Sequence, residues 1–159
     1  MTMKKVLPLI AILLVFASCG SAKKNYKKTA RTTPADRIVN HAQSFSGTPY
    51  AWGGTTRKGM DCSGLIYVSY QKEDITLPRV SRDMATRGKK INKSAIKKGD
   101  LVFFKTSKSS KKINHVGLVT EVKSGVVYFI HSTSSKGVLT SSLEEKYWKN
   151  AYTEARRLL

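Results

Sequence analysis

The chain has 159 residues, and 29 lysines and arginines against 10 aspartates and glutamates give it a formal net charge of +19. This length is enough for one folded domain. The basic residues are scattered and are not interleaved with aromatic side chains that could stack on bases, so the charge does not indicate nucleic-acid binding. A basic surface of this kind suits anionic polymers of the cell envelope or anionic lipid headgroups, or is simply a solvated surface.

The first residues have the pattern of an export signal. Two lysines precede the apolar run VLPLIAILLVFA, which is too short to span a bilayer comfortably. The small residues Ala17 and Ser18 before Cys19 resemble a lipobox, although Phe16 stands where that pattern prefers leucine. We therefore expect residues 1–18 to be a lipoprotein signal peptide, and Cys19 to carry palmitate and anchor the protein to a membrane. Ordinary cleavage that leaves Cys19 free or disulfide-bonded is the alternative.

The next segment has the composition of a tether. Residues 19–33 are rich in lysine, serine and threonine and almost lack apolar side chains, so we expect a flexible basic linker before a domain at residues 34–159. Gly20 replaces the aspartate that in some bacteria retains lipoproteins at the inner membrane. We therefore expect an anchor in the outer membrane, facing the periplasm, and a monomer tethered by its lipid.

Helix signals dominate the first half of the domain. Thr33, Pro34 and Asp36 form a capping pattern, and the apolar residues that follow recur at helical spacing until a glycine and a proline at positions 47 and 49. We expect His41 on the solvent-exposed side of this helix. A glycine-rich loop precedes a second helix, predicted from position 61 to about 70, and a short helix is predicted to begin at Ser81.

Strand signals dominate the second half. We predict strands at residues 100–104, 115–122 and 126–132, a polar loop at 105–114, and shorter strands at 137–140 and 154–158. Helices followed by an antiparallel sheet indicate the α+β class.

Cys62 lies where a thiol becomes reactive. If Cys19 carries lipid, Cys62 has no disulfide partner left in the chain. Asp61 is a good N-cap residue, which would make Cys62 the first residue of the second helix, near unpaired N–H groups and the positive end of the helix dipole. We therefore predict a lowered thiol pKa and a nucleophilic thiolate. A buried, inert thiol is the alternative.

Two histidines are predicted to share one face of a hairpin. A three-residue loop at 123–125 would pair Val122 with Val126, and would place Gly117 opposite His131, with His115 as a diagonal neighbour. A cysteine nucleophile needs a base and a group that orients the base. The pattern therefore predicts a cysteine at a helix N-terminus facing a histidine pair on a sheet. The alternative is that both histidines belong to ordinary polar surface.

Six motifs, in order, cover nearly all of residues 34–159. They are TPYAWGG (48–54), DCSGL (61–65), LPRVS (77–81), GDLVFF (99–104), NHVGLV (114–119) and IHSTSSKGV (130–138). Together they resemble the NlpC family of bacterial cell-wall cysteine peptidases, whose compact domain is papain-like. The resemblance implies a domain in which N-terminal helices pack on a central antiparallel sheet or barrel.

The resemblance also implies the catalytic roles. Cys62 would be the nucleophile, and His115 would take its proton and later protonate the leaving amine. His131 would orient His115. The backbone N–H of Cys62, with Tyr50 nearby, would stabilise the oxyanion.

Four further residues are implied to contact substrate. Asp61 and Ser63 would help hold the free amino end of a peptidoglycan stem peptide. Arg79 and Ser81 would line the groove, although a structural role for LPRVS is equally compatible with the sequence.

The implied reaction is hydrolysis of an amide in the peptidoglycan stem through an acyl-thioenzyme. The bond would be that between D-glutamate and the diamino acid, or the cross-link between the diamino acid and D-alanine. No metal or other cofactor is expected. Cys62, His115 and His131 could form a three-ligand zinc site, but the CxxC and HxxxH spacings typical of zinc are absent.

Two other functions remain compatible with the sequence. One is a peptidoglycan-binding lipoprotein without turnover, although a binding module has no need of a cysteine with two histidines. The other is an acyl- or amide-transferring enzyme of the same fold, which would need an apolar acyl channel. The apolar residues here are accounted for by the core.

Overall fold

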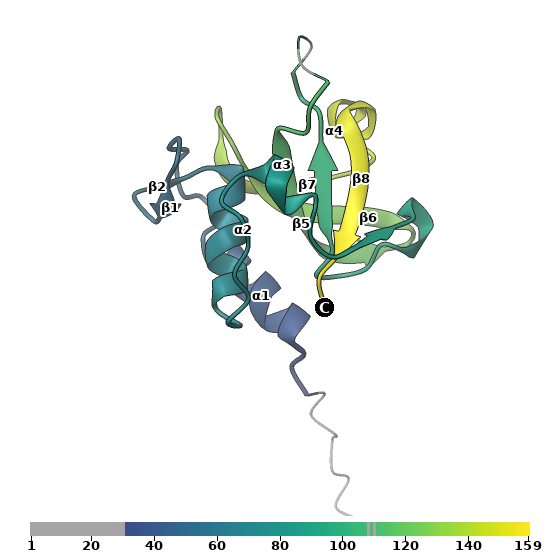
Figure 1. Cartoon of the computed structure of the whole chain (residues 1–159), viewed down its shortest axis with the longest axis horizontal. Helices are drawn as coiled ribbons and strands as arrows, with labels where there is room; N and C mark the ends of the chain where they lie inside the picture. Colours follow the sequence, from purple (N-terminus) through teal and green to yellow (C-terminus); the bar gives the residue numbers. More distant parts are fainter. Residues whose placement is uncertain (1–30, 108, 110) are drawn as a thin grey trace, which may run out of the picture. The chain divides into compact units, whose positions relative to one another are not determined.

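The computed structural model describes residues 31–107, 109 and 111–159 (Figure 1). The predicted signal peptide, the lipidation site Cys19 and residues 20–30 of the predicted linker lie outside the described residues. Across the described part of the chain, no helix is both long enough and apolar enough to cross a membrane. The elements are α1 (Pro34–Gln43), β1 (Thr55–Thr56), β2 (Gly59–Met60), α2 (Cys62–Gln71), α3 (Ser81–Met84), β3 (Lys89–Ile91), a 3₁₀ turn (Lys93–Ala95), β4 (Leu101–Phe104), β5 (His115–Lys123), β6 (Val126–Thr133), β7 (Gly137–Ser142), α4 (Lys146–Ala151) and β8 (Tyr152–Arg157).

Helix α1 begins as its capping pattern predicts. Thr33 Oγ1 accepts a hydrogen bond from the backbone N–H of Asp36 at 3.1 Å, and Asp36 Oδ2 accepts one from the N–H of Thr33 at 2.9 Å. These two bonds satisfy donors that the first turn of a helix otherwise leaves unpaired. The short helix predicted at Ser81 is also present, as α3.

Six antiparallel strands form the main sheet, in the order β3-β8-β4-β5-β6-β7. The predicted strands are all present, with ends that differ by one or two residues. The expectation missed β3, the small β1–β2 pair and helix α4, because short elements with few apolar residues have weak sequence signals. The arrangement of helices followed by an antiparallel sheet is nonetheless the predicted α+β class.

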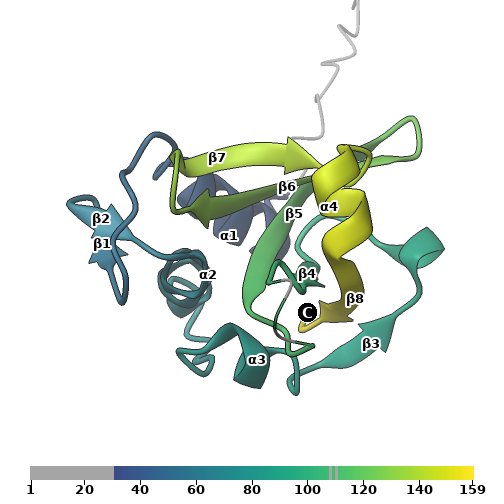
Figure 2. The ribbon, with the colours of Figure 1, turned by 90° about the horizontal axis from the view of Figure 1, so that it is seen from above.

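The sheet separates two hydrophobic clusters. Leu101 and Phe103 of β4 join the cluster that α1 and α2 cover, whereas Val102 and Phe104 join the cluster that contains Trp148 of α4. Because neighbouring side chains of a strand point to opposite faces, a strand buried on both faces is a continuous apolar run, as in DLVFF. Figure 2 shows α1 and α2 on one side of the strands and α4 on the other.

The β5–β6 hairpin has the predicted pairing around the histidines, but its turn differs from the predicted one. The predicted three-residue loop is wrong: Lys123 pairs with Val126 across a two-residue turn in which Ser124 and Gly125 have φ of 50° and 79°. Positive φ at both positions is typical of a type I′ turn. This register alone would put the two histidines on opposite faces of the sheet.

A β-bulge at Thr120 restores the register. The pairing shifts between Val119 and Glu121, so that Leu118 lies opposite Ile130. Continued by one residue, this register sets Gly117 opposite His131, as predicted. The extra residue of the bulge therefore compensates for the shorter turn and returns both histidines to one face.

Candidate active site

Asp61 caps the helix that carries the cysteine. Its Oδ1 accepts a 2.7 Å hydrogen bond from the backbone N–H of Gly64, and Cys62 is the first residue of α2, as predicted. A Cβ at Gly64 would lie 2.1 Å from the carbonyl oxygen of Gly54, so only glycine allows the 48–60 loop to approach α2 this closely.

The predicted lowering of the thiol pKa is wrong. Burial raises the pKa of the Cys62 thiol above its ordinary value, and the neighbouring Asp61 carboxylate raises it further. Hydrogen bonds from the backbone N–H groups of Val116, Ser63 and Cys62 itself act in the predicted direction but do not outweigh burial. The bond from Val116 nevertheless sets the thiol beside the start of β5, where His115 is the adjacent residue.

The two histidines of the hairpin form a directly bonded pair. Nε2 of His115 lies 2.9 Å from Nδ1 of His131, with the two rings perpendicular at 89°. His131 is fully buried, and His115 is almost so. Burial lowers the pKa of His115 to about 4, and burial together with repulsion from the protonated form of His115 lowers the pKa of His131 to about 3. Both imidazoles are therefore neutral at pH 7, and His115 can accept a proton there.

Trp148 of α4 covers this pair, and sequence reasoning missed it. Its ring stacks on His115 at a centroid distance of 5.1 Å and an angle of 22°, and meets His131 at 4.5 Å and 83°. Trp148 is only 8% exposed although it belongs to the polar segment SSLEEKYWKN. A tryptophan in so polar a segment indicates either a packing role or an exposed contact surface, and only the structure identifies a packing role for Trp148.

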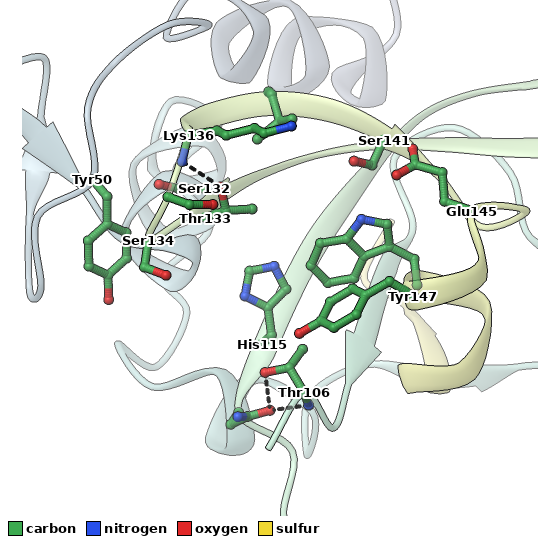
Figure 3. A pocket seen from close by; sticks show the side chains of 14 residues that line it. Tyr50, Thr106, His115, Ser132, Thr133, Ser134, Lys136, Ser141, Glu145 and Tyr147 are labelled. Atoms are coloured by element: carbon green, nitrogen blue, oxygen red, sulfur yellow. Dashed lines mark hydrogen bonds between the residues drawn. The ribbon is translucent and has the colours of Figure 1, made fainter. Parts of the chain in front are cut away.

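A cavity of about 490 Å³ opens beside His115 (Figure 3). Figure 3 shows His115 between Tyr50 on one side and Tyr147 on the other. Hydroxyl and amide side chains dominate its wall. The lining residues are Tyr50, Thr106, Asn114, His115, Ser132, Thr133, Ser134, Ser135, Lys136, Leu139, Ser141, Glu145, Tyr147 and Trp148.

Tyr50 reaches this cavity because its loop is fixed to the sheet. The backbone N–H of Val138 donates to the carbonyl of Thr48 at 2.9 Å, and Gly137, at φ 65°, passes so close that a Cβ would lie 2.1 Å from the same oxygen. Burial raises the pKa of the Tyr50 hydroxyl, and the charges of Asp61 and Cys62 act in the same direction. The hydroxyl therefore stays protonated and can donate a hydrogen bond.

The remaining predicted substrate residues meet in a second cavity, of about 360 Å³. Its wall includes Asp61, Ser63, Arg79 and Ser81, so the structure brings all four together. Asn114 lines both cavities. Cys62 is flanked by residues that line the second cavity, and its thiol lies next to the strand that carries His115. Cys62 itself is in the wall of neither cavity, but its neighbours Asp61 and Ser63 line the second one and His115 lines the first.

Two other expectations concern histidine and metal. His41 is partly buried, not solvent-exposed as predicted; its ring packs edge-on against Phe45 at 5.1 Å, and burial lowers its pKa. Among the described residues, no three histidine, cysteine, aspartate or glutamate side chains are grouped so as to hold a metal ion.

Comparison with known proteins places this geometry in a family. The NlpC/P60 family matches residues 47–157. The chain is 38% identical to the probable endopeptidase NlpC of Escherichia coli K12, over 98% of this chain and all of that protein. It is 36% identical to the murein DD-endopeptidase MepS/murein LD-carboxypeptidase of the same organism, over 77% of this chain but only 62% of that protein.

A solved structure agrees with these relatives. An NlpC/P60 family protein from Bacillus cereus superposes with a TM-score of 0.72 at 33% identity, over 80% of this chain and 41% of that one. The likeness confirms the predicted papain-like α+β fold. Because the match spans most of the sequence and the fold agrees, the chain belongs to the NlpC/P60 family.

Proposed function

We propose that the chain is a peptidoglycan endopeptidase that works through Cys62, His115 and His131. The observation that carries the proposal is the 2.9 Å contact between the histidines beside a cysteine at a helix N-terminus. The names of the relatives, a probable endopeptidase and a murein DD-endopeptidase, support the same substrate class.

The mechanism begins with the tautomer of His115. If its Nε2–H donates to Nδ1 of His131, its own Nδ1 is an acceptor. This nitrogen takes the proton of the Cys62 thiol as sulfur attacks the amide carbonyl, so thiolate and imidazolium form together. Concerted transfer suits the raised thiol pKa and the lowered histidine pKa, because burial disfavours either charge alone.

The next steps use groups around the thiol. The backbone N–H of Cys62 and the hydroxyl of Tyr50 would donate to the oxyanion of the tetrahedral intermediate. His115 then gives its proton to the leaving amine, and the C–N bond breaks to leave a thioester on Cys62. Water, deprotonated by His115, hydrolyses the thioester and restores the free thiol.

The scissile bond is the amide between D-glutamate and the diamino acid, or the cross-link between the diamino acid and D-alanine. The test is digestion of purified peptidoglycan by the chain in detergent, beside C62A, with the products identified by mass spectrometry. New stem-peptide fragments that are absent with C62A identify the bond. A folded protein that binds peptidoglycan but gives no Cys62-dependent fragments contradicts the proposal and favours a binding module.

We further propose that the protein is a lipoprotein, with residues 1–18 as its signal peptide and palmitate on Cys19. The support is the lipobox-like sequence and the basic linker that follows. Its location would be the outer membrane, facing the periplasm, as a monomer. Labelled palmitate should enter the wild-type chain and not C19A, and C19A should leave the membrane fraction on cell fractionation.

A further inference from the structure

The cavity beside Asp61 has an unexpected charge. The resemblance implied that Asp61 and Ser63 hold a free amino end, which requires an acceptor that is open to an ammonium group. All ten acidic residues of the chain lie in its described part, and Asp61 is the only one that lines this cavity. The state of its carboxylate therefore decides what the cavity can bind.

Both oxygens of Asp61 are already occupied. Oδ1 accepts from the N–H of Gly64 at 2.7 Å, from Ser63 Oγ at 3.1 Å and from Arg79 Nη1 at 2.8 Å. Oδ2 accepts from the N–H of Gly53 at 2.8 Å and from Arg79 Nη2 at 2.9 Å. A carboxylate offers about four lone-pair sites, so these five donors leave no acceptor for a further cation.

The hydroxyl of Ser63 is engaged in the same network. It donates to Asp61, and it accepts from Arg79 Nη1 at 2.8 Å. The guanidinium of Arg79 also donates to the carbonyl of Gly54 at 3.1 Å, which fixes its plane against the 48–60 loop. Such a bidentate arginine–aspartate pair is specific in its geometry and is not displaced by a simple amine at low cost.

The uncompensated charge in the cavity is positive. Arg79 neutralises Asp61, and Arg82 adds a second guanidinium to the lining. The nearest acidic group to Arg82 is Asp83, at 3.7 Å, and both side chains are exposed to solvent. An ammonium group placed here would lie beside positive charges and would find no carboxylate oxygen free to accept its hydrogen bonds. Such an arrangement discriminates against a ligand with a free amino end.

Apolar surface lies at the rim of this cavity. Trp52 is 90% exposed, the most exposed large hydrophobic side chain among the described residues, and Val80 is 49% exposed. An exposed indole beside polar groups is typical of a contact surface. It suits a bulky uncharged substituent and not a small hydrated cation.

We propose that this cavity excludes a free ammonium group and takes a stem peptide whose amino end is acylated, as it is while the stem remains joined to the glycan strand. Arg79 is then the specificity-determining residue, because it occupies the carboxylate that would otherwise bind the amine. The inference rests on the proposed function, and it implies that the enzyme acts on intact wall in preference to released peptides.

The test compares two substrates that differ only at the amino end. L-Ala-γ-D-Glu-diamino acid-D-Ala is prepared with a free and with an acetylated amino end, and kcat/KM is measured for each with the full chain in detergent. The acetylated peptide should be cleaved at least about tenfold more efficiently. Equal rates, or a preference for the free amine, would overturn the inference while leaving the endopeptidase proposal intact.

Three single variants test which arginine causes the preference for the acetylated peptide. R79Q removes the guanidinium charge and frees the carboxylate of Asp61 to accept a hydrogen bond from an amine. The ratio of kcat/KM for the acetylated peptide to kcat/KM for the free peptide should then fall by about tenfold or drop below one. R82Q should lower this ratio less, because Arg82 adds positive charge to the cavity but does not pair with Asp61. R87Q is the matched control, since Arg87 is exposed and lines neither active-site cavity, and it should leave the ratio unchanged.

If neither peptide is cleaved, the affinity of the cavity for each peptide is measured instead. Calorimetry with C62A should then show tighter binding of the acetylated peptide. Binding of the free amine with equal or higher affinity overturns the inference. Failure to bind either peptide counts against both the inference and the proposed function.

Discussion

Nε2 of His115 and Nδ1 of His131 are 2.9 Å apart, and the second ring nitrogen of His131 is buried without a hydrogen-bond partner among the described residues. Within the described part of the chain, His131 therefore makes its one hydrogen bond with His115. A residue that only filled space at this position would not need that contact, so substitutions that keep or remove a hydrogen-bonding atom distinguish the two roles.

Replacement of His131 should affect turnover more than binding. H131A removes the acceptor for His115 Nε2–H, and kcat should fall by roughly 10²-fold with little change in KM. H131N places an amide oxygen near the position of Nδ1 and should recover much of the loss. Steady-state kinetics measure both, with the melting temperature as a check on folding. Equal loss in the two variants would contradict an orienting role.

The thiol of Cys62 should react slowly with alkylating agents at neutral pH. Burial and Asp61 raise its pKa, so the iodoacetamide rate of C19S should rise with a midpoint above about 8.5, the usual value for a cysteine. The same protein in denaturant provides the control with an ordinary midpoint. A midpoint below 8 in the folded protein would mean that a thiolate–imidazolium pair forms before substrate binds.

Folding stability should fall on mild acidification. The pKa values of His115 and His131 are lowered to about 4 and 3, so the unfolded chain binds more protons below pH 6.5. Their contribution is complete above pH 6.5 and is lost as pH falls toward 3. The melting temperature should drop by at least about 5 °C between pH 7 and pH 4.5.

His41, whose pKa is also lowered, contributes to this drop in the same direction. The double variant H115N/H131N should lose most of the slope, and H41N a smaller part of it. A slope that is unchanged in the double variant would show that other groups cause the acid sensitivity.

Loss of the Trp148 ring should affect both stability and the acid limb of activity. W148A removes a side chain that is 8% exposed and should destabilise the fold by about 3–5 kcal/mol. It also admits water to both imidazoles, which should raise their pKa and move the acid limb of kcat/KM to higher pH. W148F keeps the aromatic cover and should show smaller changes in both denaturant unfolding and the pH profile.

Local patterns were sufficient to predict much of the fold. The cap of α1, the N-cap position of Asp61 and the continuous apolar run of β4 each depend on neighbouring residues, so the sequence displays them directly. The six motifs, through their resemblance to a known family, also predicted which cysteine and which histidines form the candidate site.

Features that depend on tertiary packing were not predictable in this way. The thiol pKa depends on burial in the folded chain, and Trp148, 33 residues after His115 in the sequence, covers the histidines. The resemblance implies that Asp61 holds an amine, and the structure adds its pairing with Arg79, which lies 18 residues further along the chain. A side chain's chemistry indicates what it can bind, but only its neighbours determine whether that capacity is already used.

The bulge at Thr120 has an evolutionary consequence. The two-residue turn leaves β5 with one residue more than regular pairing with β6 can use, and the bulge takes that residue out of the pairing, which keeps His115 and His131 on one face. Deletion of Thr120 should therefore remove the bulge, keep Gly117 opposite His131 and preserve activity. One residue inserted between Gly117 and Leu118 should instead turn His115 to the other face of the sheet and abolish activity. Related chains are therefore expected to vary in length at the bulge and in the turn independently, whereas the number of paired residues between the turn and each histidine is kept.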